Sequence, residues 1–84
     1  MKKKICYWEY NSLTKSHNLM IWHSDEACGF VRHPDQYRTD VYAASYVAQA
    51  AKYFSSIEEG KEFVESVVKE NGWKVLSTRE VNLL

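Results

Sequence analysis

The sequence predicts a small α+β domain in which one amphipathic helix packs on a small antiparallel β-sheet. Three observations lead to this prediction: an apolar stripe with helical spacing over residues 57–71, aromatic and β-branched residues near the N-terminus, and alternation after the helix. A chain of 84 residues has too little surface to bury in two separate cores. Residues 1–84 are therefore expected to form a single globular domain.

The N-terminal segment is expected to form a β-hairpin. Residues 4–10 are rich in aromatic and β-branched side chains, which favour strands, and residues 19–23 form a second short apolar run. Residues 11–18 between them have the composition of a turn, so they predict a long connecting loop. Residues 29–33 are a candidate third strand, which ends before Pro34.

A helix at about residues 57–71 has the clearest pattern. Glutamates and lysines occupy the surface outside its apolar stripe, as in a helix that buries one side. Ser56 and Glu59 have the spacing of a capping box, and the Asn-Gly pair at 71–72 supplies a left-handed stop. Residues 73–81 then alternate, which favours a C-terminal strand paired into the sheet. The apolar stripe consists of Ile57, Gly60, Phe63, Val64, Val67 and Val68.

Residues 41–54 fit two structures. Five alanines after Asp40 favour a helix, whereas three tyrosines and two valines favour a strand, and helix is the preferred interpretation. Tyr42 and Tyr46 share a side in either structure, because both periods bring residues four apart to the same face. In a helix, the side opposite the tyrosines is also apolar, so both sides of the segment would need to be covered. That opposite side consists of Val41, Ala44, Val47, Ala48, Ala51 and Phe54.

Charge and hydropathy exclude several classes of partner. The 11 basic and 11 acidic residues balance, so no net field draws the chain to nucleic acid or to an anionic membrane. No apolar run approaches the roughly 20 residues of a membrane helix. Polar residues at Glu9, Asn11 and Ser12 interrupt the apolar stretch that a signal peptide would need. A cytoplasmic location without membrane contact is therefore expected, with Cys6 and Cys28 as reduced thiols.

One group of residues suggests metal or thiol chemistry. His23, Cys28 and His33 have the spacing H-x4-C-x4-H, and zinc accepts such nitrogen and sulfur ligands. The spacing matches none of the tight pairs of zinc motifs, so neither a metal nor another cofactor is expected. An alternative interpretation is a small metal- or thiol-dependent enzyme, with Cys28 as nucleophile and His23 or His33 as base. Because so short a chain encloses little volume for a substrate, an enzyme is not the preferred class.

A second alternative is a protein that binds single-stranded nucleic acid. Trp8, Tyr10 and Trp22 of the hairpin could supply stacking surfaces for bases. Such a site also needs cations beside the rings, and Lys15 is the only Lys or Arg within residues 5–24. Nucleic acid is therefore not the expected partner.

The aromatic content points to a binding surface. Three Trp, six Tyr and three Phe exceed what a thin core needs, and Tyr and Trp dominate the energetics of protein interfaces. We therefore expect a non-catalytic protein-binding module that acts through an aromatic surface. Its partner would be another protein or a second copy of the chain as a homodimer, and an inhibitor of the type that mobile elements or phages encode is one such role. The residues expected at this surface are Tyr42, Tyr46, Tyr53, Tyr37, Trp8 and Tyr10.

Overall fold

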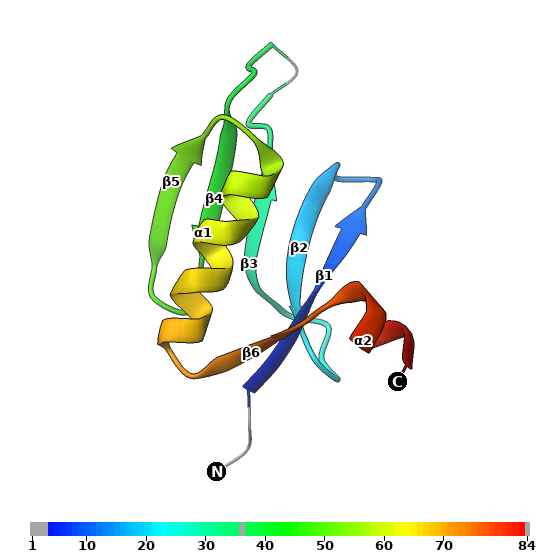
Figure 1. Cartoon of the computed structure of the whole chain (residues 1–84). Helices are drawn as coiled ribbons and strands as arrows, with labels where there is room; N and C mark the ends of the chain where they lie inside the picture. Colours follow the sequence, from blue (N-terminus) through cyan, green and yellow to red (C-terminus); the bar gives the residue numbers. More distant parts are fainter. Residues whose placement is uncertain (1–3, 36, 84) are drawn as a thin grey trace.

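Five consecutive antiparallel strands and one distant strand form a single mixed sheet, with a long helix across one of its faces (Figure 1). The computed structural model describes residues 4–35 and 37–83. The coarse prediction of a small α+β domain is confirmed, although the sheet is larger than expected. The strands are β1 (Lys4–Asn11), β2 (Ser16–Ile21), β3 (Ala27–Arg32), β4 (Val41–Ser45), β5 (Ala50–Phe54) and β6 (Trp73–Leu76). The helices are α1 (Ile57–Glu70) and α2 (Thr78–Leu83).

The first and last strands of the chain pair with each other in this sheet. The strand order is β5-β4-β3-β2-β1-β6, and every neighbouring pair is antiparallel except β1 and β6, which are parallel. The chain leaves β5 at one edge, crosses the sheet as α1 and adds β6 at the opposite edge (Figure 1). Helix α1 contacts β3, β4, β5 and β6 on its way. One face of the sheet is therefore covered by α1, and most of the other is not.

The core lies between α1 and the sheet. The predicted apolar stripe faces inward, with Gly60, Val64 and Val68 fully buried. The backbones of α1 and the sheet come close, since a Cβ atom at Gly60 would lie 2.8 Å from Val31 Cγ1. Burial of these side chains removes apolar surface from water and supplies the main driving force for folding. The buried cluster contains Cys6, Leu19, Cys28, Val31, Val41, Ala43, Val64 and Val68.

Both ends of α1 agree with the prediction. The Ser56 hydroxyl accepts a hydrogen bond from the Glu59 N–H at 3.2 Å, and Gly72 adopts the left-handed conformation with φ +86°. The other half of the expected capping box differs, because the Glu59 carboxylate accepts from the Ser55 hydroxyl at 2.8 Å. The helix thus begins after the Ser56 cap and ends before Gly72, as the sequence predicts.

The preferred helical interpretation of residues 41–54 is wrong. The segment forms the β4–β5 hairpin, with Val41 paired to Phe54 and a turn that contains Gln49 at φ +51°. The small side chain of Ala43 fits the limited space beneath α1. A Cβ atom at Gly60 would lie only 3.3 Å from the Ala43 Cβ, so a larger side chain at position 43 would push α1 away from the sheet.

The expected C-terminal strand is also shorter than its alternation predicts. Strand β6 ends at Leu76, and the chain then forms α2, which the sequence interpretation missed. Ser77 and Glu80 make a reciprocal capping box: the Ser77 N–H donates to Glu80 Oε1, and the Glu80 N–H donates to Ser77 Oγ, both at 3.1 Å. This box ends the strand and starts α2, which contacts both β1 and β6.

The N-terminal half forms the expected strands with different bounds. The β1–β2 hairpin is closed by residues 12–15 alone, so its connection is shorter than the predicted loop. The third strand begins at Ala27 and is irregular beside the Leu19–Met20 step of β2. Neither helix in residues 4–35 and 37–83 is long and apolar enough to cross a lipid bilayer.

Candidate functional site

An array of aromatic rings occupies the sheet face opposite α1. Because side chains alternate along a strand, burial of Val41 and Ala43 beneath α1 places Tyr42 on the opposite face. Tyr53 is directly across from Tyr42 on the neighbouring strand, and their ring centroids are 5.1 Å apart. We use the name tyrosine face for the array of Phe30, Tyr42, Tyr46 and Tyr53.

Phe30 connects the array to a third strand. Its ring centroid lies 5.8 Å from that of Tyr42 and 5.9 Å from that of Tyr46. Tyr46 is 60% exposed and Tyr53 is 48% exposed, so both rings reach solvent in the isolated chain. The structure thus brings Tyr42, Tyr46 and Tyr53 together, as expected. It adds Phe30, which the sequence analysis missed because only the β3–β4 register places it beside Tyr42.

Two arginines stack at the margin of the tyrosine face. The Arg38 guanidinium lies 4.9 Å from the Tyr53 ring centroid and donates to both carboxylate oxygens of Asp40, at 3.0 and 2.6 Å. These hydrogen bonds raise the pKa of Arg38 and neutralise its charge locally. The Arg32 guanidinium lies 5.9 Å from the Phe30 centroid, and it forms no ion pair with a carboxylate in the described part of the chain. The margin therefore carries one uncompensated cation.

The other three predicted surface residues lie elsewhere. Tyr37 is 86% exposed in the connection between β3 and β4, where its N–H donates to Asp35 Oδ1. Trp8 lies on the α1 side of the sheet, and its indole N–H donates to Glu65 Oε2 at 3.0 Å. Tyr10 stands near the end of β1, with its ring centroid 4.7 Å from that of His17. The expected six-residue surface is thus divided among separate places.

The residues of the metal or thiol alternative do not meet. Cys28 is buried within β3, whereas His23 lies in the turn before this strand and His33 lies beyond its far end. Five strand residues span about 16 Å, which is too far for Cys28 and His33 to share one ion. No cluster of three His, Cys, Asp or Glu side chains suited to a metal occurs among residues 4–35 and 37–83.

The two thiols face the core rather than solvent. Cys28 Sγ donates to the Leu19 carbonyl at 3.4 Å, and Cys6 Sγ donates to the Lys74 carbonyl at 3.5 Å. The neighbouring Cys28 thiol, together with burial, raises the pKa of Cys6. The same contact lowers the pKa of Cys28, against the opposing effect of burial. Neither sulfur is placed where a substrate could reach it as a nucleophile.

The hairpin aromatics do not form one stacking platform. Trp8 and Tyr10 belong to the α1 side of β1, whereas Trp22 packs edge-on against Tyr7, which belongs to the opposite side, with centroids 5.4 Å apart. Lys61 of α1 supplies a cation near this hairpin, with its Nζ atom 5.3 Å from the Trp8 ring centroid. The platform considered for nucleic acid is therefore split between two faces.

These features define a class: a small α+β domain with a mixed sheet, one face covered by a helix and the other exposing aromatic side chains. Comparisons with models of protein families, with curated proteins and with solved structures find no match. We therefore infer function from the chemistry of the surfaces.

Proposed function

We propose that this protein is a non-catalytic binding module whose tyrosine face is covered by a partner protein. One observation carries the proposal: four aromatic rings, from three neighbouring strands and the β4–β5 turn, form a continuous array on the sheet face that α1 leaves uncovered. Tyrosine buries a large area with few rotatable bonds and keeps a hydroxyl for hydrogen bonding. Such residues commonly supply most of the binding energy of a protein interface.

The charges favour a protein partner over nucleic acid. Single-stranded nucleic acids require a basic groove that follows the phosphates, in addition to stacking rings. Here Asp40 compensates Arg38, and among residues 4–35 and 37–83 Arg32 is the stacked arginine at this margin that has no ion pair. We take the occupant to be a different protein that presents an apolar patch with an acidic group beside it, because this pattern complements the rings and Arg32.

The buried thiols support a binding role over catalysis. A thiol nucleophile needs a base within hydrogen-bonding reach and access for the substrate. Cys28 is 2% exposed, and the two histidines that could activate it lie at opposite ends of its strand. The chemistry considered for these residues thus has no common site.

The test compares one double alanine variant with a control variant. Tyr46→Ala combined with Tyr53→Ala should weaken binding to a purified partner at least about tenfold, which corresponds to about 1.4 kcal/mol. Tyr37→Ala removes a more exposed tyrosine outside the tyrosine face and should leave affinity unchanged. The partner is captured from cells that express the protein naturally, and its affinity is measured by isothermal titration calorimetry.

Three results would contradict the proposal. One is equal binding by the double variant and the wild type. Another is loss of the folded circular dichroism spectrum in the double variant, which would make these rings structural. The third is a wild-type dimer that the double variant converts to monomer, because the occupant would then be a second copy of the chain.

A further inference from the structure

The outer edge of β1 is only partly paired. Strand β6 pairs with β1 from Lys4↔Trp73 to Tyr7↔Leu76, whereas β2 continues along the other edge as far as Asn11. Within the described residues, no strand pairs with the outer edge of residues 8–11. The capping box of α2 explains this gap, because it ends the strand pairing directly after β6, and α2 then packs against β1 as a helix.

The backbone groups at this edge can be identified from one hydrogen bond. The Trp22 N–H donates to the Ile5 carbonyl at 2.8 Å, so odd-numbered residues of β1 direct their backbone groups toward β2. The backbone N–H and carbonyl groups of even-numbered residues point away from β2, toward the outer edge. The Trp8 carbonyl and the N–H and carbonyl of Tyr10 therefore face outward. Backbone groups of this kind need a hydrogen-bond partner, which is water in the isolated chain.

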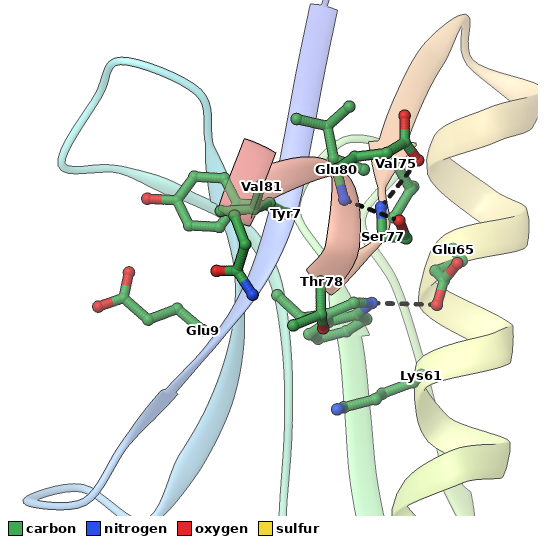
Figure 2. Close-up of a pocket in the computed structure, with 12 residues that line it drawn as sticks. Tyr7, Glu9, Lys61, Glu65, Val75, Ser77, Thr78, Glu80 and Val81 are labelled. Atoms are coloured by element: carbon green, nitrogen blue, oxygen red, sulfur yellow. Dashed lines mark hydrogen bonds between the residues drawn. The ribbon is translucent and has the colours of Figure 1, made fainter. Parts of the chain in front are cut away.

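A groove with a volume of about 580 Å³ lies at the start of this edge, where Tyr7, Trp8 and Glu9 of β1 line it. Figure 2 shows Lys61 and Glu65 extending from α1 on one side, with Thr78 of α2 nearby. Trp8 contacts both α1 side chains: its indole N–H donates to Glu65, and Lys61 Nζ lies 5.3 Å from its ring centroid. Four residues of extended chain span about 13 Å, so residues 8–11 offer a short edge for an added strand.

The charges of the groove specify the kind of segment that fits. Its charged lining residues are Glu9, Glu65 and Glu80 against Lys61. Glu65 pairs with Lys69 and Glu80 pairs with Lys74, while Glu9 is exposed and has no ion-pair partner among residues 4–35 and 37–83. A basic side chain directly across from Glu9 would therefore complete a cross-strand ion pair.

We propose that this groove binds an extended segment of a partner protein, which adds to β1 as a short strand with alternating basic and apolar side chains. The residue across from Glu9 shares its face and is basic. The residues across from Trp8 and Tyr10 point toward α1 and are apolar, because they meet the Trp8 ring. This pattern is the same for a parallel and an antiparallel strand, since the sheet face alternates in both.

This inference does not rest on the function proposed for the tyrosine face. The rings of that face come from β3 to β5, whereas the groove follows the far edge of β1. The Tyr46→Ala and Tyr53→Ala double variant should therefore bind the segment like the wild type. The two proposals can fail independently.

The probe is a fluorescein-labelled, N-acetylated peptide of alternating lysine and valine, seven residues long, whose binding is followed by fluorescence anisotropy. Only alternate N–H groups of an added strand point toward β1, so N-methylation of one residue type should abolish binding and N-methylation of the other should preserve it. Loss with methylated valine indicates an antiparallel strand, and loss with methylated lysine indicates a parallel one. Equal binding by both methylated peptides, equal loss with both, or no binding of the parent peptide at about 1 mM would overturn the proposal.

A protein variant tests the same edge. Tyr10→Pro removes the outward N–H without removing a donor to β2, and it should weaken peptide binding about tenfold or more. Tyr10→Ala keeps the N–H and should change the affinity less than about threefold.

If Tyr10→Pro does not fold, amide hydrogen exchange of the wild type tests whether this edge binds the peptide. The Tyr10 amide should exchange faster than those of Glu9 and Asn11, and the peptide should slow it. Unchanged exchange at Tyr10, or a wild-type dimer that Tyr10→Pro dissociates, would overturn a partner segment as the occupant.

Discussion

Gly29 brings α1 and the sheet into close contact. A Cβ atom at this position would lie 2.6 Å from Val64 Cγ1 and 2.8 Å from the Ala44 carbonyl oxygen. The valine side chain could move slightly, but the carbonyl belongs to the backbone of the adjacent strand. The absence of a side chain at position 29 is therefore a packing requirement.

Gly29→Ala should destabilise the protein by about 2 kcal/mol, because the added methyl group overpacks the α1–β3 contact. Ala51→Ser on the exposed surface of β5 serves as control and should stay within about 0.5 kcal/mol of the wild type. Urea unfolding measures both free energies. Equal stability of the Gly29→Ala variant and the wild type would show that the sheet can shift to accept a methyl group.

His17 should make stability depend on pH. Partial burial lowers its pKa below the ordinary value of 6.5, and repulsion from Lys61 lowers this pKa further by a smaller amount. The folded state therefore binds the proton less readily than the unfolded state. The stabilising contribution is fully present above pH 6.5 and is lost as the pH falls through the lower folded pKa.

The measurement compares urea unfolding of wild type and His17→Gln at about pH 7.5 and about pH 5.5. The wild type should lose more stability on acidification than the variant, since glutamine does not titrate. An identical loss in both proteins would assign the pH dependence to other groups.

At the scale of elements, α1 depends on its N-terminal cap. Ser56→Ala removes the acceptor of the Glu59 N–H and should cost about 1 kcal/mol, whereas Glu62→Ala on the exposed side should stay within about 0.5 kcal/mol. Thermal unfolding followed by circular dichroism at 222 nm compares the two variants. Equal shifts in Tm would mean that the hydroxyl does not stabilise the helix terminus.

The β4–β5 hairpin shows where local propensity fails. Alanine favours helix in isolated segments, but here Ala43 is a strand residue that admits the close approach of Gly60. Tyr42 and Tyr46 nevertheless lie on one side, as predicted, because that result does not depend on choosing between helix and strand. Helix α2 was missed for a related reason: alternation over residues 73–78 hid the Ser77–Glu80 capping box.

At the scale of the molecule, the pairing of β1 with β6 connects the first and last strands of the sequence. Helix α1 packs on strands from both halves of the sheet, so neither half retains its core without it. We expect a single cooperative unfolding transition.

Two probes test this cooperativity. Tryptophan fluorescence reports mainly on the region around β1 and β6, because all three tryptophans lie in or next to β1, β2 and β6. These are Trp8, Trp22 and Trp73. Far-UV circular dichroism reports on the whole backbone. Their urea midpoints should coincide. A separate, earlier transition in circular dichroism alone would show that the β3–β5 region unfolds independently.

The sequence by itself determined the α+β class, the bounds of α1 and the shared side of Tyr42 and Tyr46. These features depend on periodicity and caps within a few residues, which any local window of the chain contains. Only the tertiary structure decided that residues 41–54 pair as a hairpin, that Phe30 joins the tyrosine face and that Trp8 turns toward α1. It also decided that β6 stops short of the end of β1 and leaves the groove open. These outcomes depend on which distant segments become neighbours, and strand register across a sheet is set by packing that no local pattern encodes.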